Sequence, residues 1–540
     1  MRQGRLDRQW NASGRRSLWG WGLAADEPTD EQRTRLAASL ARGYGVEPRV
    51  EPPASVGGAD LRPPRLEVPA ALAGTCLTDP WERARHTHGM AYTDRLRAYR
   101  GRFDDPPDAV AYPADEAELE AVLDWCDTSA HVVVPFGGGS SVVWGVNPPA
   151  EAATVVTVDL TAMDRVLEID HVSRAARIQA GALGPAVEDQ LRPHGLTLRH
   201  FPQSFEWSTV GGWIATRSGG HYATNHTHID DFVESVRMLT PSGWWESRRL
   251  PGSGAGPSPD RLVLGSEGTL GIVSEAWLRL QRRPRFRATA GVRFPSWEAG
   301  GDGVRAIAQA KLWPANLRIL DPAEAERGAG LDGRTALVIV GFESADVPQQ
   351  ANIEAAVALA RDHGGQVGDD EVRVTDAGTP TGRGGSVGAW RDSFVGFDLN
   401  SMTGLGLVAD TFETAITWDR WPDFDASVRA ALTRALDDVC GGGLLSCRFT
   451  HVYPDGPAPY YTFAGMGSQG GEEQQWTELK EAASEAVVAA GGTITHHHAV
   501  GRMHRPAYDR QRPDLFATAL RAAKRSLDPQ GLLNPGVLID

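Results

Sequence analysis

The hydrophobic pattern of the chain predicts an α+β protein from about residue 108 onward. Residues 132–136 (Val-Val-Val-Pro-Phe) form an uninterrupted apolar run, which is typical of a buried strand. Asp115 precedes a stretch in which apolar residues recur at helical spacing, so we expect a helix capped by this aspartate. Further strands are predicted at 109–113, 154–160, 165–169 and 175–180, and a helix at 185–191.

The pattern changes near Pro284, where shorter strands alternate with helices. Strands at 289–294 and 335–342 and helices at 303–310 and 350–363 give a β–α–β order, which suggests a second, substrate-capping domain. The last part is predicted to be helical, at 474–490 and 512–526. We therefore divide the chain into an N-terminal segment (1–95), a first α+β domain (96–284), a cap domain (285–470) and a C-terminal helical part (471–540).

Three glycine-bearing loops lie in the first domain, at 135–142, 202–213 and 264–272. Glycine lets a backbone approach a ligand closely, and free N–H groups in such turns bind phosphate. Each loop alone could be a plain tight turn. Three loops in one α+β region predict a large phosphate-bearing cofactor, and the chain lacks the GxxxxGK[ST] motif of ATP-binding proteins.

Composition narrows the class of partner. The 540-residue chain is 41% hydrophobic and carries a net charge of −15, which argues against nucleic acid or an anionic membrane as the main partner. No window approaches a membrane span, and the start lacks the apolar region of a secretory signal. The four cysteines form no CxxC pair, which fits a reduced cytoplasm, and the heavy use of Ala, Gly, Arg and Asp is typical of a GC-rich bacterial genome. We therefore expect a cytoplasmic bacterial protein.

Three consecutive histidines at 496–498 stand between the pair Gly491-Gly492 and Gly501. On an extended segment neighbouring side chains alternate between faces, so His496 and His498 would point one way and His497 the other. The plain alternatives are a surface tract or a metal-binding tract. A metal site would need further ligands, for which the candidates by residue type are His221, His226, His228 and His451. We expect no metal.

With these motifs in place, the chain resembles the alkyldihydroxyacetonephosphate synthases (alkylglycerone-phosphate synthases), which belong to the vanillyl-alcohol-oxidase-type FAD-binding superfamily. The glycine loops resemble ones shared across the superfamily, including D-2-hydroxyacid dehydrogenases. More specific marks are Thr-Phe-Glu-Thr-Ala at 411–415 with Trp-Asp-Arg at 418–420, Cys447-Arg448, Tyr460 and above all the histidine run. The resemblance implies a two-subdomain FAD-binding domain at 96–284, an α/β cap domain, and C-terminal helices that complete the FAD site and the active site.

The resemblance also implies FAD as the cofactor, and we expect it to be bound non-covalently. Residues 217–221 (Arg-Ser-Gly-Gly-His) look like the motif that carries covalent flavin in other branches, but they follow the second glycine loop, whereas the first loop ends in Ser140-Ser141. The positions that match cofactor-binding ones are Pro135, Phe136, Gly137, Gly138, Gly139, Ser140, Ser141, Pro202, Ser208, Thr209, Gly211, Gly212, Thr216, Ile229, Glu267, Gly268, Thr269 and Ile272.

In the resembled family FAD works without net redox change. The flavin N5 is thought to attack C1 of acyl-dihydroxyacetone phosphate and expel the fatty acid, and a fatty alcohol then takes its place to leave an ether bond. Such chemistry needs a group that takes and returns a proton at the substrate carbon. By resemblance, Tyr460 matches the catalytic tyrosine, and His497, between His496 and His498, matches the middle of the active-site triplet. The implied substrates are lipid-derived, and we expect peripheral contact with a membrane and a homodimer.

The chain departs from the family at one point. The family places an Arg-Asp pair shortly before the 410–414 segment and assigns its arginine to the substrate phosphate, but that count lands on Leu399, which cannot bind phosphate. Arg391, Arg420 or Arg448 could substitute; otherwise the substrate is not dihydroxyacetone phosphate. Two rival hypotheses remain: an FAD-linked dehydrogenase or oxidase of a D-2-hydroxy acid or other alcohol, and a catalytically idle binding or scaffold module.

Overall fold

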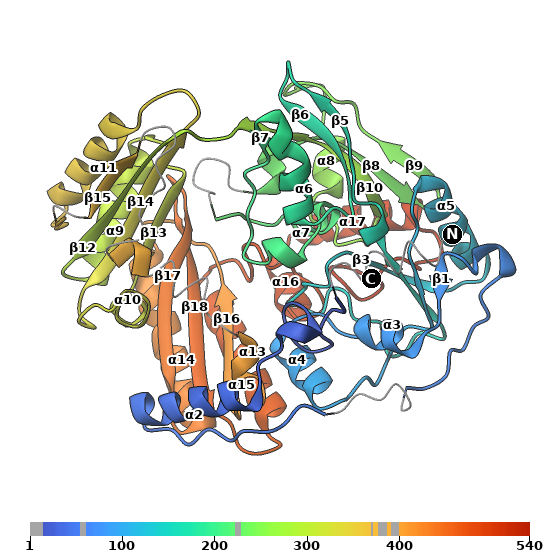
Figure 1. The fold of residues 1–540 in the computed structure, drawn as a ribbon, viewed down its shortest axis with the longest axis horizontal. Helices are drawn as coiled ribbons and strands as arrows, with labels where there is room; N and C mark the ends of the chain where they lie inside the picture. The colour runs from blue at the N-terminus through green and yellow to red at the C-terminus, as the bar shows by residue number, and fades with distance from the viewer. Residues whose placement is uncertain (1–13, 55–60, 222–227, 369–370, 376–385, 390–398) are drawn as a thin grey trace.

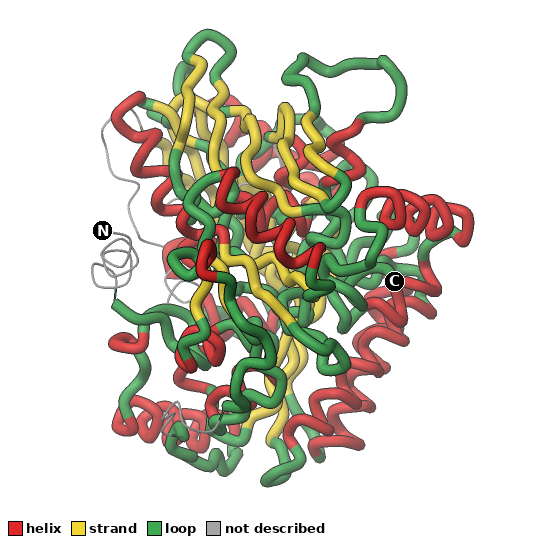
Figure 2. The backbone as a smooth tube through the Cα atoms, turned by 90° about the vertical axis from the view of Figure 1, so that its right-hand side faces the viewer, coloured by secondary structure: helices red, strands yellow, loops and turns green. Residues whose placement is uncertain are grey.

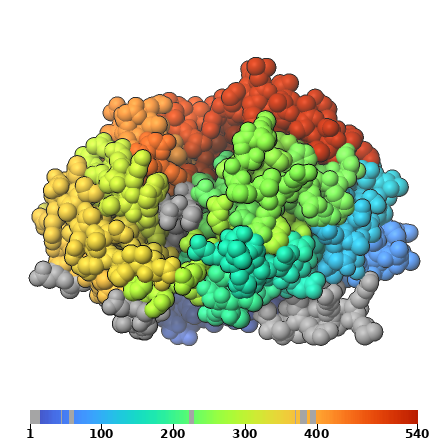
Figure 3. All heavy atoms as spheres, turned by 90° about the horizontal axis from the view of Figure 1, so that it is seen from above, coloured from blue at the N-terminus to red at the C-terminus, as the bar shows by residue number. Residues whose placement is uncertain are grey.

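The computed structural model describes residues 14–54, 61–221, 228–368, 371–375, 386–389 and 399–540. The chain forms two lobes, which lie side by side in Figure 1 and again from above in Figure 3. One hydrophobic core joins residues 72–280 to the end of the chain at 500–539, and a second core joins residues 288–487. The last residues therefore return to the first lobe after the second lobe is complete.

The first lobe contains a four-stranded and a five-stranded sheet. The first has the order β1-β2-β4-β3, with parallel pairs on both sides of β4, and the second has the antiparallel order β5-β6-β10-β8-β9. A short pair, β7 with β11, leads toward the second lobe. The strands are β1 Cys76–Leu77, β2 Ala109–Ala111, β3 Val132–Phe136, β4 Val155–Asp159, β5 Val166–Asp170, β6 Ala175–Gln179, β7 Leu196–Thr197, β8 Val233–Thr240, β9 Gly243–Glu246, β10 Ile272–Arg279 and β11 Gln281–Arg282.

The second lobe is built on one seven-stranded sheet in the order β15-β12-β14-β13-β17-β18-β16. Every neighbouring pair of strands is antiparallel. Strands and helices alternate along the chain as expected, but in the sheet β14 lies between β12 and β13. The strands are β12 Phe286–Phe294, β13 Asn316–Leu320, β14 Ala336–Ser344, β15 Val372–Thr375, β16 Leu407–Glu413, β17 Leu444–Val452 and β18 Pro457–Met466. Mainly antiparallel sheets with helices around them, visible in the side view of Figure 2, confirm the predicted α+β class.

Helices cover the sheets of both lobes. Those of the first lobe are α3 Pro80–Arg85, α4 Tyr92–Tyr99, α5 Glu116–Thr128, α6 Gly184–Leu191, α7 Val210–Thr216, α8 Pro259–Val263, α16 Arg505–Gln511 and α17 Asp514–Leu527. Those that lie against the second lobe are α2 Asp30–Tyr44, α9 Trp297–Gln309, α10 Pro322–Ala329, α11 Gln350–Asp362, α13 Leu399–Met402, α14 Trp421–Cys440 and α15 Glu472–Ala489. No helix among the described residues is long and apolar enough to cross a membrane.

Side-chain caps fix several helix starts. Asp115 accepts the Glu118 N–H at the start of α5, as the sequence predicts, and Thr29 forms a reciprocal capping box with Gln32. Helix α9 begins at Trp297, six residues before the predicted start, because Ser296 caps it. Its glycines Gly300, Gly301 and Gly303 give room to Ile319, Trp421 and Phe294 from neighbouring elements.

Asp108 ties the N-terminal segment to the first sheet. Its fully buried carboxylate accepts hydrogen bonds from the side chains of Arg62 and Arg65 and from the N–H groups of Arg65 and Val155. Burial alone would raise the pKa of this carboxyl, but the hydrogen bonds outweigh burial and lower the pKa to about 2. The charged form is therefore the stable form in the folded protein.

We predict that Asp108→Ala lowers the free energy of unfolding by about 2–3 kcal/mol at pH 7, because hydrogen bonds to a buried charge are lost. Because the folded pKa lies below the unfolded value, this stabilisation is present above about pH 4 and is lost as the pH falls toward 2. Urea unfolding at pH 7 and pH 3 measures both effects. Asp346→Ala, which removes an exposed ion pair with Arg282, is the control and should cost less than about 1 kcal/mol. Equal stability of Asp108→Ala and the parent protein at pH 7 would contradict the prediction.

Candidate active site

Strand alternation places the predicted catalytic tyrosine on the face of the large sheet opposite the long helices. Tyr461 and Phe463 of β18 point into the core with α14 and α15, so Tyr460 lies on the other face. Tyr460 pairs across the sheet with Glu413 of β16 and with Arg448 of β17. These three side chains therefore form one row beside the histidine run.

The histidine run lies against this row. The ring of Tyr460 is 6.0 Å from that of His497, with 23° between the two planes, and 5.6 Å from that of His498. The Tyr460 hydroxyl donates to Thr411 Oγ1 at 3.0 Å, and the guanidinium of Arg448 lies 4.2 Å over the tyrosine ring. The structure thus brings together the residues that the sequence proposed as catalytic, Tyr460 and His496 to His498.

The backbone of the run is not extended, which corrects the expectation of alternating faces. It bends around the buried carboxylate of Glu413, which accepts the N–H groups of all three histidines at 2.5–3.1 Å. Thr495 adds its hydroxyl at 2.7 Å. All three imidazoles consequently gather around one carboxylate, with Nδ1 of His497 and His498 3.5 and 3.6 Å from its oxygens.

A second carboxylate, from the first lobe, holds the next residues of the same segment. Glu267 lies in the third glycine loop with a φ of 52°, and its two oxygens accept the N–H groups of Val500 and Gly501 at 2.9 and 2.8 Å. Glu267 was predicted to contact the cofactor, but its side chain is occupied by this contact. Burial raises the pKa of its carboxyl to about 7, against the effect of the two hydrogen bonds.

Burial also sets the protonation states of the site. It lowers the pKa of His496 to about 3 and lowers the pKa of His497 and His498, although Glu413 opposes this effect for all three. Burial would raise the pKa of Glu413, but the neighbouring imidazoles and the Thr495 hydroxyl lower it. Because neutral imidazoles carry no net charge, the ionised carboxylate depends mainly on the three N–H groups and the hydroxyl that bond it. At neutral pH the site therefore contains neutral imidazoles around an ionised carboxylate.

Three further residues, His228, His451 and Tyr453, adjoin the histidine run. The sequence indicates the two histidines as candidates but not the tyrosine. His451 is buried, and its Nε2 has no hydrogen-bond partner among the described residues. Tyr453 places its hydroxyl between His496 Nε2 at 2.6 Å and His228 Nε2 at 3.1 Å. Tyr453 had no sequence signal apart from its place two residues after His451.

The geometry partly supports the alternative that the histidine run binds a metal ion. One nitrogen from each of His451, His496 and His497 lies within 4.8 Å of the others, which is compatible with three ligands of one ion. His221 is engaged elsewhere, because its Nδ1 lies 2.6 Å from Arg318 Nη2, and His226 lies outside the described residues. The absence of a resident metal stays a prediction.

The three glycine loops converge in the first lobe. A Cβ added to Gly138 would lie 1.7 Å from the Trp207 carbonyl oxygen, and one added to Gly268 would lie 2.9 Å from Pro135. Glycine is therefore needed for the loops to touch. Several hydroxyls predicted to bind cofactor are already bonded within the protein: those of Ser208, Thr209, Thr216, Thr269 and Ser141.

Other predicted cofactor positions contribute packing. Ile229 and Ile272 are buried in the core of the first lobe, and Phe136 is buried against His86. Gly137 and Gly211 lie against Thr209 and Ala180, so they too serve contacts within the protein. The remaining positions, Pro202, Gly139, Ser140 and Gly212, lie on the same loops. These loops offer backbone groups, rather than free side chains, to a phosphate-bearing ligand.

Two arginines beside the glycine loop at 135–142 could bind the phosphates of the cofactor. The sequence alone does not indicate them. Arg16 and Arg85 both direct a guanidinium group to the Gly138 carbonyl, at 3.4 and 3.3 Å, and Nε of each is buried without a hydrogen-bond partner in the described part of the chain. Burial and the neighbouring Arg85 hold the pKa of Arg16 well below its usual value. Two adjacent, partly buried cations of this kind favour an anion between them, as the diphosphate of FAD would provide.

The arginines proposed for the substrate phosphate have different environments. Arg448 is buried and paired with Glu324 at 2.9 Å, so it is not a free phosphate ligand. Arg420 is exposed, donates to the Ala490 carbonyl, and lines a cavity of about 320 Å³. Arg391 lies outside the described residues.

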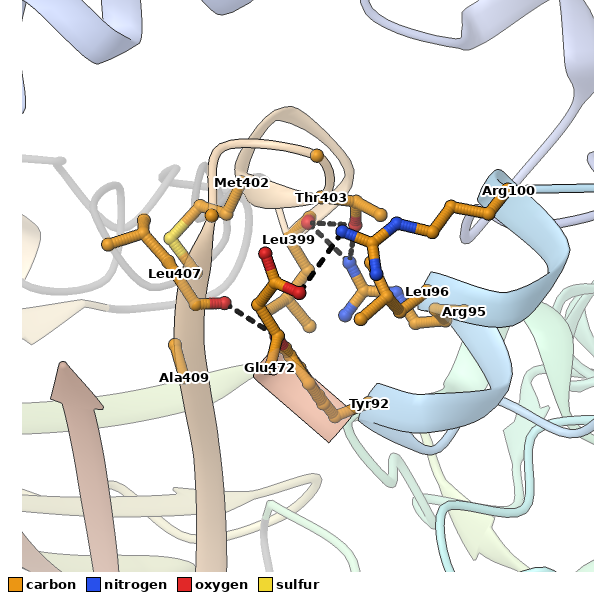
Figure 4. Close-up of a pocket in the computed structure, with 12 residues that line it drawn as sticks. Tyr92, Arg95, Leu96, Arg100, Leu399, Met402, Thr403, Leu407, Ala409 and Glu472 are labelled. Atoms are coloured by element: carbon orange, nitrogen blue, oxygen red, sulfur yellow. Dashed lines mark hydrogen bonds and ion pairs between the residues drawn. The ribbon is translucent and has the colours of Figure 1, made fainter. Parts of the chain in front are cut away.

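Leu399 lies away from the catalytic row. It opens α13 and lines a pocket with Arg95, whose guanidinium donates to the Leu399 carbonyl at 2.5 Å (Figure 4). Leu407, at the start of β16, lines the same pocket, and Glu413 ends that strand about 20 Å farther on. The residue at this position therefore does not define the catalytic centre.

Comparison with known proteins agrees with this geometry. Residues 107–247 match the FAD binding domain family, and residues 283–538 match the family of FAD linked oxidases, C-terminal domain. Alkyldihydroxyacetonephosphate synthase of Dictyostelium discoideum is 28% identical over 481 residues, covering 85% of this chain and 78% of that protein. Glycolate oxidase subunit GlcD of Bacillus subtilis is 28% identical over 442 residues, covering 81% of this chain and 89% of that protein.

Solved structures show the same fold. A crystal structure of an alkyldihydroxyacetonephosphate synthase matches with a TM-score of 0.78 at 22% identity, covering 96% of this chain and 98% of that one. p-Cresol methylhydroxylase matches with a TM-score of 0.65 at 15% identity, covering 87% and 95%. The resemblance to alkyldihydroxyacetonephosphate synthases is confirmed, and the chain combines an FAD-binding domain with an FAD-linked oxidase C-terminal domain, as an FAD-dependent enzyme does.

Proposed function

We propose that the protein exchanges the acyl group of acyl-dihydroxyacetone phosphate for a fatty alcohol, as an alkylglycerone-phosphate synthase does. The observation that carries this proposal is the packing of Tyr460 against His497 around the buried Glu413. A phenol and a neutral imidazole at one point can together give and take a proton. The similarity to alkyldihydroxyacetonephosphate synthases over 85% of the chain supports the choice of reaction.

When bound, FAD would supply the covalent chemistry at the substrate carbon. Side chains of the protein accept and donate the protons. Burial keeps His497 neutral and thus able to accept a proton from C1, and burial raises the pKa of Tyr460, so the phenol stays protonated and able to donate. Arg448, 4.2 Å over the tyrosine ring, stabilises any negative charge that develops on the phenol oxygen.

Of the two candidate arginines that the structure describes, Arg420 is better placed than Arg448 to meet the substrate phosphate. It lines the cavity of about 320 Å³ together with Tyr453 and Thr493, which adjoin the histidine run. Because it is exposed, and its guanidinium bonds only the Ala490 carbonyl among the described residues, its remaining donors can bind an anion. A lipid-derived substrate also needs an apolar approach, and Leu515 and Phe516 in the first turn of α17, 84% and 50% exposed, support peripheral contact with a membrane.

The second candidate is oxidation of a hydroxy acid by the same cofactor. The similarity to the glycolate oxidase subunit over 81% of the chain favours it, as does the grouping of three imidazole nitrogens, which could bind a metal and a carboxylate. The two functions differ in their redox balance. Anaerobic titration of the flavin absorbance with acyl-dihydroxyacetone phosphate and with 2-hydroxy acids therefore separates them.

We expect the acyl compound, and no hydroxy acid, to bleach the flavin, and addition of fatty alcohol to give an ether product. Tyr460→Phe should lower kcat by about 10²–10³-fold because proton transfer is lost, with FAD still bound. Tyr461→Phe is the matched control, since this neighbour faces the helical side and bonds Asp425; its kcat should stay within about threefold. Full activity of Tyr460→Phe, or bleaching by a hydroxy acid alone, would contradict the proposal.

We predict that Arg85→Ala raises the dissociation constant of FAD by about tenfold or more, because a partly buried cation beside the first glycine loop is lost. Fluorescence titration of FAD-free protein with FAD measures the constant. Arg35→Ala, which removes an exposed ion pair with Glu31, is the control and should leave it unchanged. An unchanged constant in Arg85→Ala would mean that the phosphates of FAD lie elsewhere.

A further inference from the structure

A continuous chain of hydrogen bonds connects the middle histidine to a partly exposed residue of the first lobe. His497 Nδ1 lies 3.0 Å from His496 Nδ1, and His496 Nε2 lies 2.6 Å from the Tyr453 hydroxyl. The same hydroxyl lies 3.1 Å from His228 Nε2, and His228 Nδ1 lies 2.9 Å from the Arg217 carbonyl oxygen. The chain thus has four links, and its far end is fixed to the backbone.

The backbone end determines the direction of every link. A carbonyl oxygen only accepts, so His228 Nδ1 must carry a hydrogen, and in a neutral ring its Nε2 must then accept from Tyr453. The tyrosine oxygen consequently accepts from His496 Nε2–H, and His496 Nδ1 accepts from His497 Nδ1–H. The hydrogen-bond partners therefore assign His497 the Nδ1–H tautomer, with a bare Nε2.

The surroundings of the chain agree with this assignment. Glu413 Oε2 lies 3.5 Å from His497 Nδ1, where a carboxylate favours a hydrogen on that nitrogen. Nε2 of His497 has no hydrogen-bond partner among the described residues, so it is available to a substrate. Burial also raises the pKa of Tyr453, which keeps the hydroxyl proton that the chain requires.

The geometry points to a proton relay, in which Tyr453 and His228 carry to the partly exposed end of the chain the proton that His497 removes from the substrate. This inference rests on the proposed function, which requires removal of a proton at the substrate carbon. His496, Tyr453 and His228 act through His497 and are positioning residues. The relay also explains why a tyrosine hydroxyl lies between imidazoles of the two lobes.

The transfer is balanced without an oxidant or reductant. The substrate C–H bond breaks, its electron pair stays on the substrate, and the proton forms a bond to His497 Nε2. The Nδ1 proton of His497 passes to His496 Nδ1, the Nε2 proton of His496 passes to Tyr453, and the hydroxyl proton of Tyr453 passes to His228 Nε2. The single extra charge then resides on His228, and the reverse sequence returns the proton.

The relay is tested with substrate deuterated at C1 and the FAD-bound protein, without fatty alcohol. We expect the parent protein to wash deuterium into water, and Tyr453→Phe to do so at least about tenfold more slowly, because the hydroxyl link is cut. Added imidazole should restore part of the rate, which it would not do for a merely structural defect. Tyr92→Phe, which removes a hydroxyl bonded to the Leu407 carbonyl, is the matched control and should exchange at the parent rate. Parent-rate washout by Tyr453→Phe with FAD bound would overturn the relay.

A second measurement is independent of the substrate. Nitrogen-15 NMR of histidine-labelled protein, with the His497 signals assigned by their loss in His497→Gln, should show the Nδ1–H tautomer for His497. An Nε2–H tautomer would overturn the relay even if the flavin responds to the acyl compound. If instead the tautomer is Nδ1–H and the acyl compound leaves the flavin unchanged, the proposed substrate is wrong and the hydrogen-bond chain stands.

Discussion

The active site depends on one buried negative charge. An isolated carboxylate inside a protein is strongly unfavourable, so Glu413 must be compensated by donors that are held in place. Three consecutive backbone N–H groups and the Thr495 hydroxyl provide this compensation. The same contacts force the histidine run to bend, and the bend places three imidazoles beside Tyr460. The geometry of the catalytic groups is thus a consequence of satisfying Glu413.

A second carboxylate extends this arrangement across the two lobes. Glu413 belongs to the large sheet of the second lobe, whereas Glu267 belongs to a glycine loop of the first lobe, and both accept N–H groups from the segment 496–501. The segment is therefore held at both ends by groups from different cores. Because the loop of Glu267 also touches the other glycine loops, the position of the imidazoles is fixed relative to the expected place of FAD.

The parts of the structure that are determined by residues close together in the sequence could be predicted from it. Asp115 caps its helix and residues 132–136 form a buried strand, because both signals are local. The sequence also identifies the histidine run, but the prediction that this run is extended was wrong. The run bends around Glu413, which lies 83 residues earlier in the chain and gives no local signal. Arg16, Arg85 and Tyr453 carry no local signal, and only the folded chain brings them to the glycine loop and the triplet.

The direct test of the Glu413 account is amide hydrogen–deuterium exchange of the segment 495–501 in Glu413→Ala, compared with the parent protein. Loss of the carboxylate removes the acceptor of three N–H groups, so we expect their exchange to become at least about tenfold faster. Helix α14, which packs on the opposite face of the same sheet, should keep its protection. Unchanged protection of residues 496–498 in a folded Glu413→Ala protein would show that the histidine run holds its shape without this carboxylate, and would contradict the account.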